Sequence, residues 1–125
     1  MHIIFGDAVN LIPDSYTVLQ LDTVRVEPTG QLIPTWCVVE KIPLAEFAVA
    51  ESNKKIHHDL MEQYYQRNWD FCLRAIESLH GAWDCELDSF YEDLTRRVQD
   101  LVQNPPGEAW DGLIVKTVDL DQEAM

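Results

Sequence analysis

The spacing of apolar residues changes once along the chain, and this change constrains the fold more than any other feature. Up to about residue 42 the apolar residues follow the two-residue repeat of β-strands, and between residues 55 and 103 they recur at helical spacing. Strands followed by helices are typical of an α+β fold. We therefore expect one α+β domain over residues 1–118, with a strand-rich part (1–42), a helical part (55–103) and a short last strand (113–118), followed by a frayed tail (119–125).

The strand-rich part predicts a β-hairpin over residues 16–42. Its two strands are Tyr16 to Val26 and Trp36 to Ile42, separated by the turn residues Pro28-Thr29-Gly30. Ile3 to Phe5 adds a short strand. We expect a short antiparallel sheet, and its few strands cannot hide both faces without helix packing, self-association or both.

A change of phase within the first hairpin strand predicts an irregularity. Leu19 and Leu21 fall on one face, whereas Val24 and Val26 fall on the other. Because side chains alternate with a period of two, the shift places a bulge or bend at Asp22-Thr23.

The helical part predicts a helical hairpin and a third helix. Ile56, Leu60 and Tyr64 form one stripe, and Asn68 has the short acceptor side chain of an N-cap. We expect Gly81 to end the second helix and the third to start near Asp84 or Asp88, with Asn104-Pro105-Pro106 stopping it. The apolar face of the second helix consists of Trp69, Cys72, Leu73, Ile76 and Leu79. The apolar face of the third consists of Leu87, Tyr91, Leu94, Val98 and Leu101.

Charge and composition exclude several classes of function. Twenty-two acidic against nine basic residues give a net charge of −13, which disfavours binding to nucleic acid or to anionic lipid. No apolar run approaches the length of a membrane helix and the start lacks a basic leader, so we expect a soluble, cytoplasmic protein without membrane association. The same charge also allows an acidic face that docks on a basic partner or imitates nucleic acid.

The cysteines predict neither a disulfide framework nor a zinc or redox motif. Cys37, Cys72 and Cys85 are odd in number and widely spaced, without a Cys-x-x-Cys pair. Cys37 lies in an apolar strand and Cys72 in an apolar helix stripe, where buried free thiols are common.

Two stretches resemble the C-terminal segment of class III adenylate and guanylate cyclases. Leu21 to Val26, followed by Gly30 and Pro34, resembles that family's closing hairpin. The helical pair over about residues 64–102, followed by Asn104-Pro105-Pro106 and Trp110-Asp111-Gly112-Leu113, resembles the tail after it. The two stretches keep the family's order across most of the chain, and the resemblance implies a cyclase tail.

The resemblance does not extend to the catalytic part. The chain leaves no room for the half that holds the metal-binding aspartates, and the hairpin turns through Glu27-Pro28-Thr29-Gly30 instead of Lys-Gly. Gly6-Asp7-Ala8-Val9-Asn10 is similar to the family's Gly-Asp-x-Val-Asn segment, but no arginine follows before Arg25. A gap-free match instead aligns Gly6 with the later Gly-Glu segment, and we prefer this alignment, in which Asn10 is a loop residue.

Few residues are candidates for a site. His58 and Glu62 lie four apart on one helix face and form the best metal candidate within the cluster His57, His58, Asp59 and Glu62, although a zinc site needs a third protein ligand. The alternative is a solvated helix face with a pH-sensitive pair. For Arg96 and Arg97, beside Glu92, Asp93 and Asp100, the plain interpretation is ion pairing on a helix surface.

Tyr65 and Phe71 fall off the main apolar stripes and are our candidates for interface residues, since aromatic side chains are favoured at contact hot spots. The sequence shows no catalytic residues, and we expect no cofactor. The leading hypothesis is a non-catalytic module for protein interaction or oligomerisation, through self-association or a protein partner. The alternatives are a small-ligand sensor (nucleotide or metal) or minor enzyme at the cleft between sheet and helices, and an acidic decoy for a basic surface.

Overall fold

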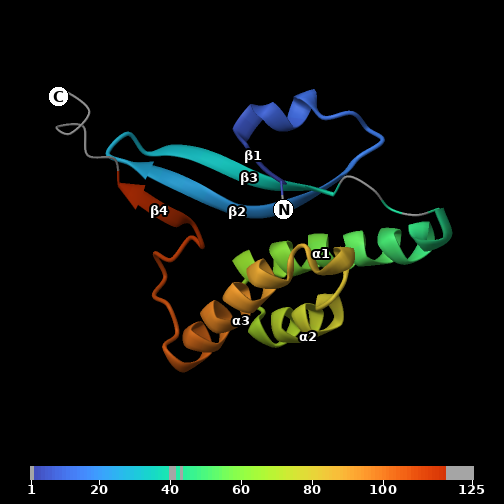
Figure 1. Cartoon of the computed structure of the whole chain (residues 1–125). Helices are drawn as coiled ribbons and strands as arrows, with labels where there is room; N and C mark the ends of the chain where they lie inside the picture. Colours follow the sequence, from blue (N-terminus) through green and yellow to red (C-terminus); the bar gives the residue numbers. More distant parts are fainter. Residues whose placement is uncertain (1, 40–41, 43, 118–125) are drawn as a thin grey trace.

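The structure is an α+β fold with a four-stranded sheet and a layer of helices on one of its faces (Figure 1). The computed structural model describes residues 2–39, 42 and 44–117. The expected α+β class is confirmed. The strands are β1 (His2–Phe5), β2 (Thr17–Glu27), β3 (Gln31–Val39) and β4 (Ile114–Thr117); the α-helices are α1 (Phe47–Tyr65), α2 (Trp69–Leu79) and α3 (Asp88–Gln103); and the 3-10 helices are η1 (Gly6–Leu11), η2 (Leu44–Glu46) and η3 (Trp83–Cys85).

The predicted hairpin is antiparallel, and β4 adds a parallel pair to it, so the sheet as a whole is mixed. The strand order is β1-β3-β2-β4, and β1, β2 and β3 pair antiparallel. β4 pairs parallel to β2, with Val24 opposite Ile114 and Glu27 opposite Thr117. The physical reason is the long connection: β3 ends beside the start of β2, and the three α-helices that follow bring the chain to Val24 of β2, from where β4 runs in the same direction as β2.

The hairpin has the irregularity that the sequence predicts. The register between β2 and β3 shifts between Gln20 and Thr23, at the predicted bulge. Pro34 lies opposite Thr23, and a proline is tolerated at such an irregular site because it has no amide hydrogen to give to the ladder. β3 ends at Val39 instead of reaching residue 42, and residues 40 and 41 lie outside the described part of the chain.

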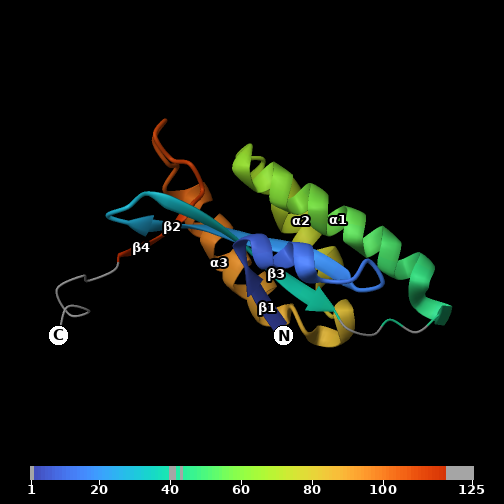
Figure 2. The ribbon, with the colours of Figure 1, turned by 90° about the horizontal axis from the view of Figure 1, so that it is seen from above.

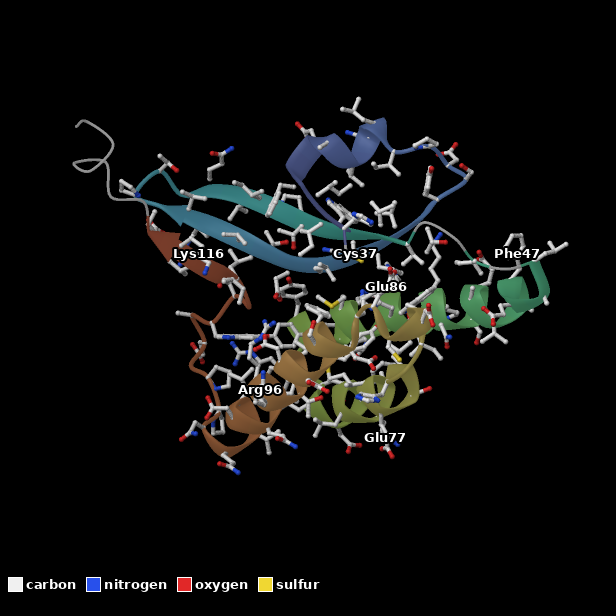
Figure 3. The ribbon with its side chains drawn as sticks, in the orientation of Figure 1. Cys37, Phe47, Glu77, Glu86, Arg96 and Lys116 are labelled. Carbon is white, nitrogen blue, oxygen red and sulfur yellow. The ribbon has the colours of Figure 1, made fainter. Side chains whose placement is uncertain are left out.

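Helix α1 begins at Phe47, well before the expected start of the helical part at residue 55. Ala48, Ala50 and Glu51 are good helix formers, but the first two turns contribute no buried residue. They extend beyond the sheet, with the side chain of Phe47 at the far end (Figures 1 and 3). A stripe-based prediction misses such turns because they carry no core-facing repeat.

The other helix boundaries follow the sequence signals. The side chain of Asn68 accepts a hydrogen bond from the amide of Phe71 and caps α2. Gly81 takes a positive φ of 83° just after α2 ends. α3 begins at Asp88 and ends at Gln103, directly before Asn104-Pro105-Pro106.

The core lies between the helices and one face of the sheet. Leu19, Leu21, Cys37 and Val39 face the helices and are buried. Cys37 lies beneath the sheet in Figure 3, and burial raises the pKa of Cys37 and of Cys72 to about 11, so both thiols are protonated and unreactive near neutral pH. The core residues of the helical layer are Leu60, Met61, Tyr64, Cys72, Ala75, Ile76, Leu79, Leu87, Tyr91, Leu94 and Val98, of which Leu87 directly precedes α3.

The opposite face of the sheet carries η1, which crosses over β2 and β3 when the molecule is seen from above (Figure 2). Asn10 lies in this short helix and is exposed. Among the described residues, no helix combines the length and the apolarity that are needed to cross a bilayer.

Candidate functional site

The predicted metal candidates lie together on the exposed side of α1. The Nε2 atom of His58 is 3.9 Å from Oε2 of Glu62, and one ligand atom from each of His58, Asp59 and Glu62 lies within 4.8 Å of the others. Asp59 also accepts a hydrogen bond from Nζ of Lys55 at 3.0 Å. Three donors on one exposed helix face leave the rest of a coordination shell to water, which is typical of weak metal binding rather than of a structural site.

His57 does not share this exposed face, which corrects its grouping with the solvated cluster. Its side chain is only 1% exposed and lies between the sheet and α3. Nε2 of His57 lies 2.6 Å from the carbonyl oxygen of Gln20, and Nδ1 lies 2.9 Å from the hydroxyl oxygen of Tyr91. Because a carbonyl only accepts, Nε2 carries the proton and Nδ1 accepts from Tyr91.

The hydrogen-bond chain continues from Tyr91 to Trp83, and every member is satisfied with the imidazole neutral. Nε1 of Trp83 donates to the hydroxyl oxygen of Tyr91 at 3.2 Å. Burial lowers the pKa of His57 below its usual value, against the opposing effect of the bond to Gln20, and burial raises the pKa of Tyr91. This series of hydrogen bonds joins β2, α1, η3 and α3, so it fixes the position of the helical layer on the sheet.

The turn that supplies Trp83 is strained. Trp83, Asp84 and Cys85 all have positive φ, between 55° and 64°. Each non-glycine residue in this left-handed region costs about 1–2 kcal/mol. The buried indole and its bond to Tyr91 offset part of that cost, and the amide of Gly81 gains a bond to Oδ1 of Asp88 at 2.9 Å.

Arg97 is not a surface ion pair, and the interpretation from the sequence is corrected here. Its guanidinium donates to both carboxylate oxygens of Asp22, at 2.9 and 2.8 Å, and also to Asp93 on its own helix. The side chains of Arg97 and Asp22 are only 23% and 17% exposed. Asp22 is the bulge residue of β2, so the pair fastens α3 to the bulge. Arg96, in contrast, points away from the sheet and is 71% exposed (Figure 3).

A second arginine, which the sequence does not single out, holds the segment of residues 106–112. The guanidinium of Arg67 donates to the carbonyl oxygens of Pro106, Gly107 and Trp110 at 2.8 to 3.3 Å, and it lies 5.3 Å from the ring centre of Trp110. Trp110 packs edge-on against Tyr64 and Trp69, each at 5.5 Å between ring centroids. These contacts direct the chain from α3 back to the sheet.

Tyr65 and Phe71, the predicted interface residues, are half-buried and pack against the core. The ring of Tyr65 lies against Gly112, where a Cβ atom would be 2.6 Å from the ring, so only glycine fits there. Tyr65 therefore contacts this chain's own 106–112 segment. The assignment of both residues to an interface stays a prediction.

The hollows of the described surface are shallow and open. One of them lies between α2 and α3, and its rim includes His80, whose Nε2 atom is 3.8 Å from Glu92. Its wall combines the aliphatic side chains of Leu73 and Ile76 with four polar ones, and Glu77 and His80 are its titratable groups. Its lining consists of Leu73, Ile76, Glu77, His80, Thr95 and Gln99.

Exposed large apolar side chains occur at several places on the described surface, including Leu11, Leu32 and Val102, and two groups of them lie close together in the sequence. Ile3 and Phe5 of β1 are 44% and 61% exposed, and Leu44, Phe47 and Val49 at the start of α1 are 50% exposed or more. The sequence did not single out either group, since each looks like an ordinary apolar stretch until the partner elements are placed. No known protein-family model, curated protein or solved structure matches this chain.

Proposed function

We propose that this protein is a non-catalytic module for association, which forms homo-oligomers or binds a protein partner through apolar surface. One observation carries the proposal. Large apolar side chains remain exposed on β1 and at the start of α1, outside a core that is otherwise well filled. Contiguous exposed apolar surface is a mark of protein contact sites.

The polar groups support the same proposal. The buried histidine, tyrosine and tryptophan bond to one another, and the half-buried Arg97 bonds to Asp22, so these groups stabilise the fold. The resemblance to the tail of class III cyclases belongs to the proposal as well: a tail module would act on the assembly of the enzyme to which it is attached and would need no chemistry of its own.

Sedimentation equilibrium over a range of protein concentrations tests the proposal. We expect the average mass to rise above the 14.4 kDa of one chain as the concentration increases. Because each copy carries a net charge of −13, added salt should strengthen self-association by screening the repulsion. A mass of 14.4 kDa throughout, in a protein whose melting temperature is raised by a nucleotide, would contradict the proposal.

One observation favours a second function, a metal sensor. The melting temperature measured with and without zinc separates it from the association module. His58, Asp59 and Glu62 place three donor atoms together on α1. If this group is a site, zinc should raise the melting temperature, and the rise should vanish in the variant His58→Ala. An equal rise in wild type and variant would exclude the site. An acidic decoy, the third hypothesis, would instead bind basic proteins less tightly as salt increases.

A further inference from the structure

Strand β1 forms one edge of the sheet, and one of its sides is open. It pairs with β3 on one side, and the strand order gives it no neighbour on the other side among the described residues. An edge strand presents a row of amide and carbonyl groups that fit another extended chain. Natural edge strands are commonly blocked by charged residues or proline, and residues 2–5 contain no lysine, arginine, acidic residue or proline.

The exposed side chains of β1 lie on the same face of the sheet as the helices. Ile3 is opposite Cys37 and Phe5 is opposite Thr35, and both of these β3 residues are buried on the helix side. Paired residues of antiparallel strands point to the same face, so Ile3 and Phe5 also point to the helix side. They are exposed because the sheet ends at β1.

The charge distribution selects a second copy of this chain as the occupant of this edge. Residues 2–5 contain no aspartate, glutamate, lysine or arginine, whereas the whole chain carries a net charge of −13. Two molecules of the same negative charge repel least where their surfaces carry the least charge. The β1 edge is such a surface, because Ile3, Ile4 and Phe5 are apolar and His2 is its one ionisable side chain.

We propose that two copies pair antiparallel through β1 about a two-fold axis that passes through Ile4. This inference rests on the proposed function and specifies its partner. In an antiparallel pair, opposite residues share a face, so the two register numbers must add to an even sum. A sum of eight places Ile3 opposite Phe5 of the second copy, so that the exposed side chains cover one another, whereas an axis at Ile3 would place Phe5 opposite residue 1, which lies outside the described part of the chain. The two sheets then form one continuous eight-stranded sheet with all α-helices on one face.

Cross-linking tests the register. In a Cys85→Ser background, which removes the exposed native thiol, the variant Ile4→Cys places two thiols opposite each other on the axis. We expect at least ten times more covalent dimer after mild oxidation than for the control Leu11→Cys, a residue that is 83% exposed and outside β1. Efficient cross-linking of Ile3→Cys together with none for Ile4→Cys would overturn the register.

Charge substitutions test the surface itself. Phe5→Lys should raise the dissociation constant of the dimer at least tenfold, and adding Ile3→Glu to it should recover much of the loss, because Glu and Lys would then be opposite each other in both symmetry-related pairs. Val49→Lys changes the net charge by the same amount at the start of α1 and should leave the constant unchanged. If Val49→Lys abolishes association and Phe5→Lys does not, the β1 pairing is wrong while the proposed function stands. If wild type does not associate at all, self-association fails and the pairing fails with it.

Discussion

At the scale of single residues, the two adjacent histidines of α1 show how strongly the environment decides a role. His57 lies on the same helix stripe as Met61 and Tyr64 and joins the buried hydrogen-bond chain, whereas the side chain of His58 is 73% exposed. Positions 57, 61 and 64 form a helical stripe in the sequence. Because histidine is a polar residue, its type alone groups His57 with the polar residues His58, Asp59 and Glu62. A helical wheel that ignored residue type would have found it.

Replacing His57 should therefore destabilise the protein. His57→Ala leaves the Gln20 carbonyl and the Tyr91 hydroxyl without a bond and opens a cavity, which should lower the free energy of unfolding by about 2–4 kcal/mol. Urea denaturation measures the effect. His58→Ala is the matched control and should change stability by less than about 0.5 kcal/mol. Equal effects of the two substitutions would contradict the assigned geometry.

The same residue gives stability a defined dependence on pH. The pKa of His57 is lower in the folded protein than in the unfolded chain, so the unfolded chain binds the proton more readily. The stability that the neutral His57 contributes is fully present above the pKa of the unfolded chain, about 6.5. It is lost as the pH falls from there through the lower pKa of the folded protein. Unfolding curves between pH 7.5 and 5 should show this loss in wild type and a smaller loss in His57→Gln. Identical pH profiles would argue against a neutral, buried imidazole.

Arg97 and Arg96 make a second matched pair. Arg97→Ala leaves Asp22 largely buried without its partner, and we expect a loss of about 2 kcal/mol, below the range for fully buried pairs because both groups keep some exposure. Arg96→Ala should cost less than about 0.5 kcal/mol because its pair with Asp93 is exposed. Thermal or urea unfolding compares them. A loss for Arg96→Ala as large as that for Arg97→Ala would contradict the contrast.

At the scale of elements, the return of the chain to the sheet depends on contacts between residues far apart in the sequence, which no local sequence pattern predicts. Asp22 and Arg97 are 75 residues apart, and Arg67 meets the carbonyl groups of Pro106 to Trp110 some 40 residues later. The hairpin, its bulge, the Asn68 cap and the proline stop of α3 were predictable because each depends on neighbours in sequence. The parallel β4 and the fastening arginines were not, since they depend on where distant elements meet.

The fork of Arg67 should control the opening of the C-terminal segment. Arg67→Lys keeps the charge but loses the planar fork that reaches several carbonyl groups. We expect the free energy of local opening to fall by about 1–2 kcal/mol, so that amides in residues 107–117 exchange roughly tenfold faster. Hydrogen exchange with mass spectrometry measures the rate. Arg74→Lys, which alters an exposed pair with Asp70 within α2, should leave those amides unchanged, and unaltered exchange in Arg67→Lys would exclude the fork as an anchor.

At the scale of the whole molecule, apolar residues join the sheet to the helices, and the apolar side chains that stay exposed include those of β1 and of the projecting start of α1. The fold class was predictable from periodicity alone, because the switch from strand to helix spacing occurs only once. The surface for association was not, because Ile3 and Phe5 are identical in sequence terms to core residues. Only the strand order shows that they lie at an edge.

Hydrogen exchange of the β1 amides at two protein concentrations tests this account most directly. A chain that associates through β1 should protect residues 2–5 more strongly when the concentration is raised a hundredfold, while the amides at the start of α1 keep their rates. Unchanged exchange of residues 2–5 at both concentrations, with sedimentation showing a single chain, would contradict the central claim that the uncovered apolar edge exists to meet another copy.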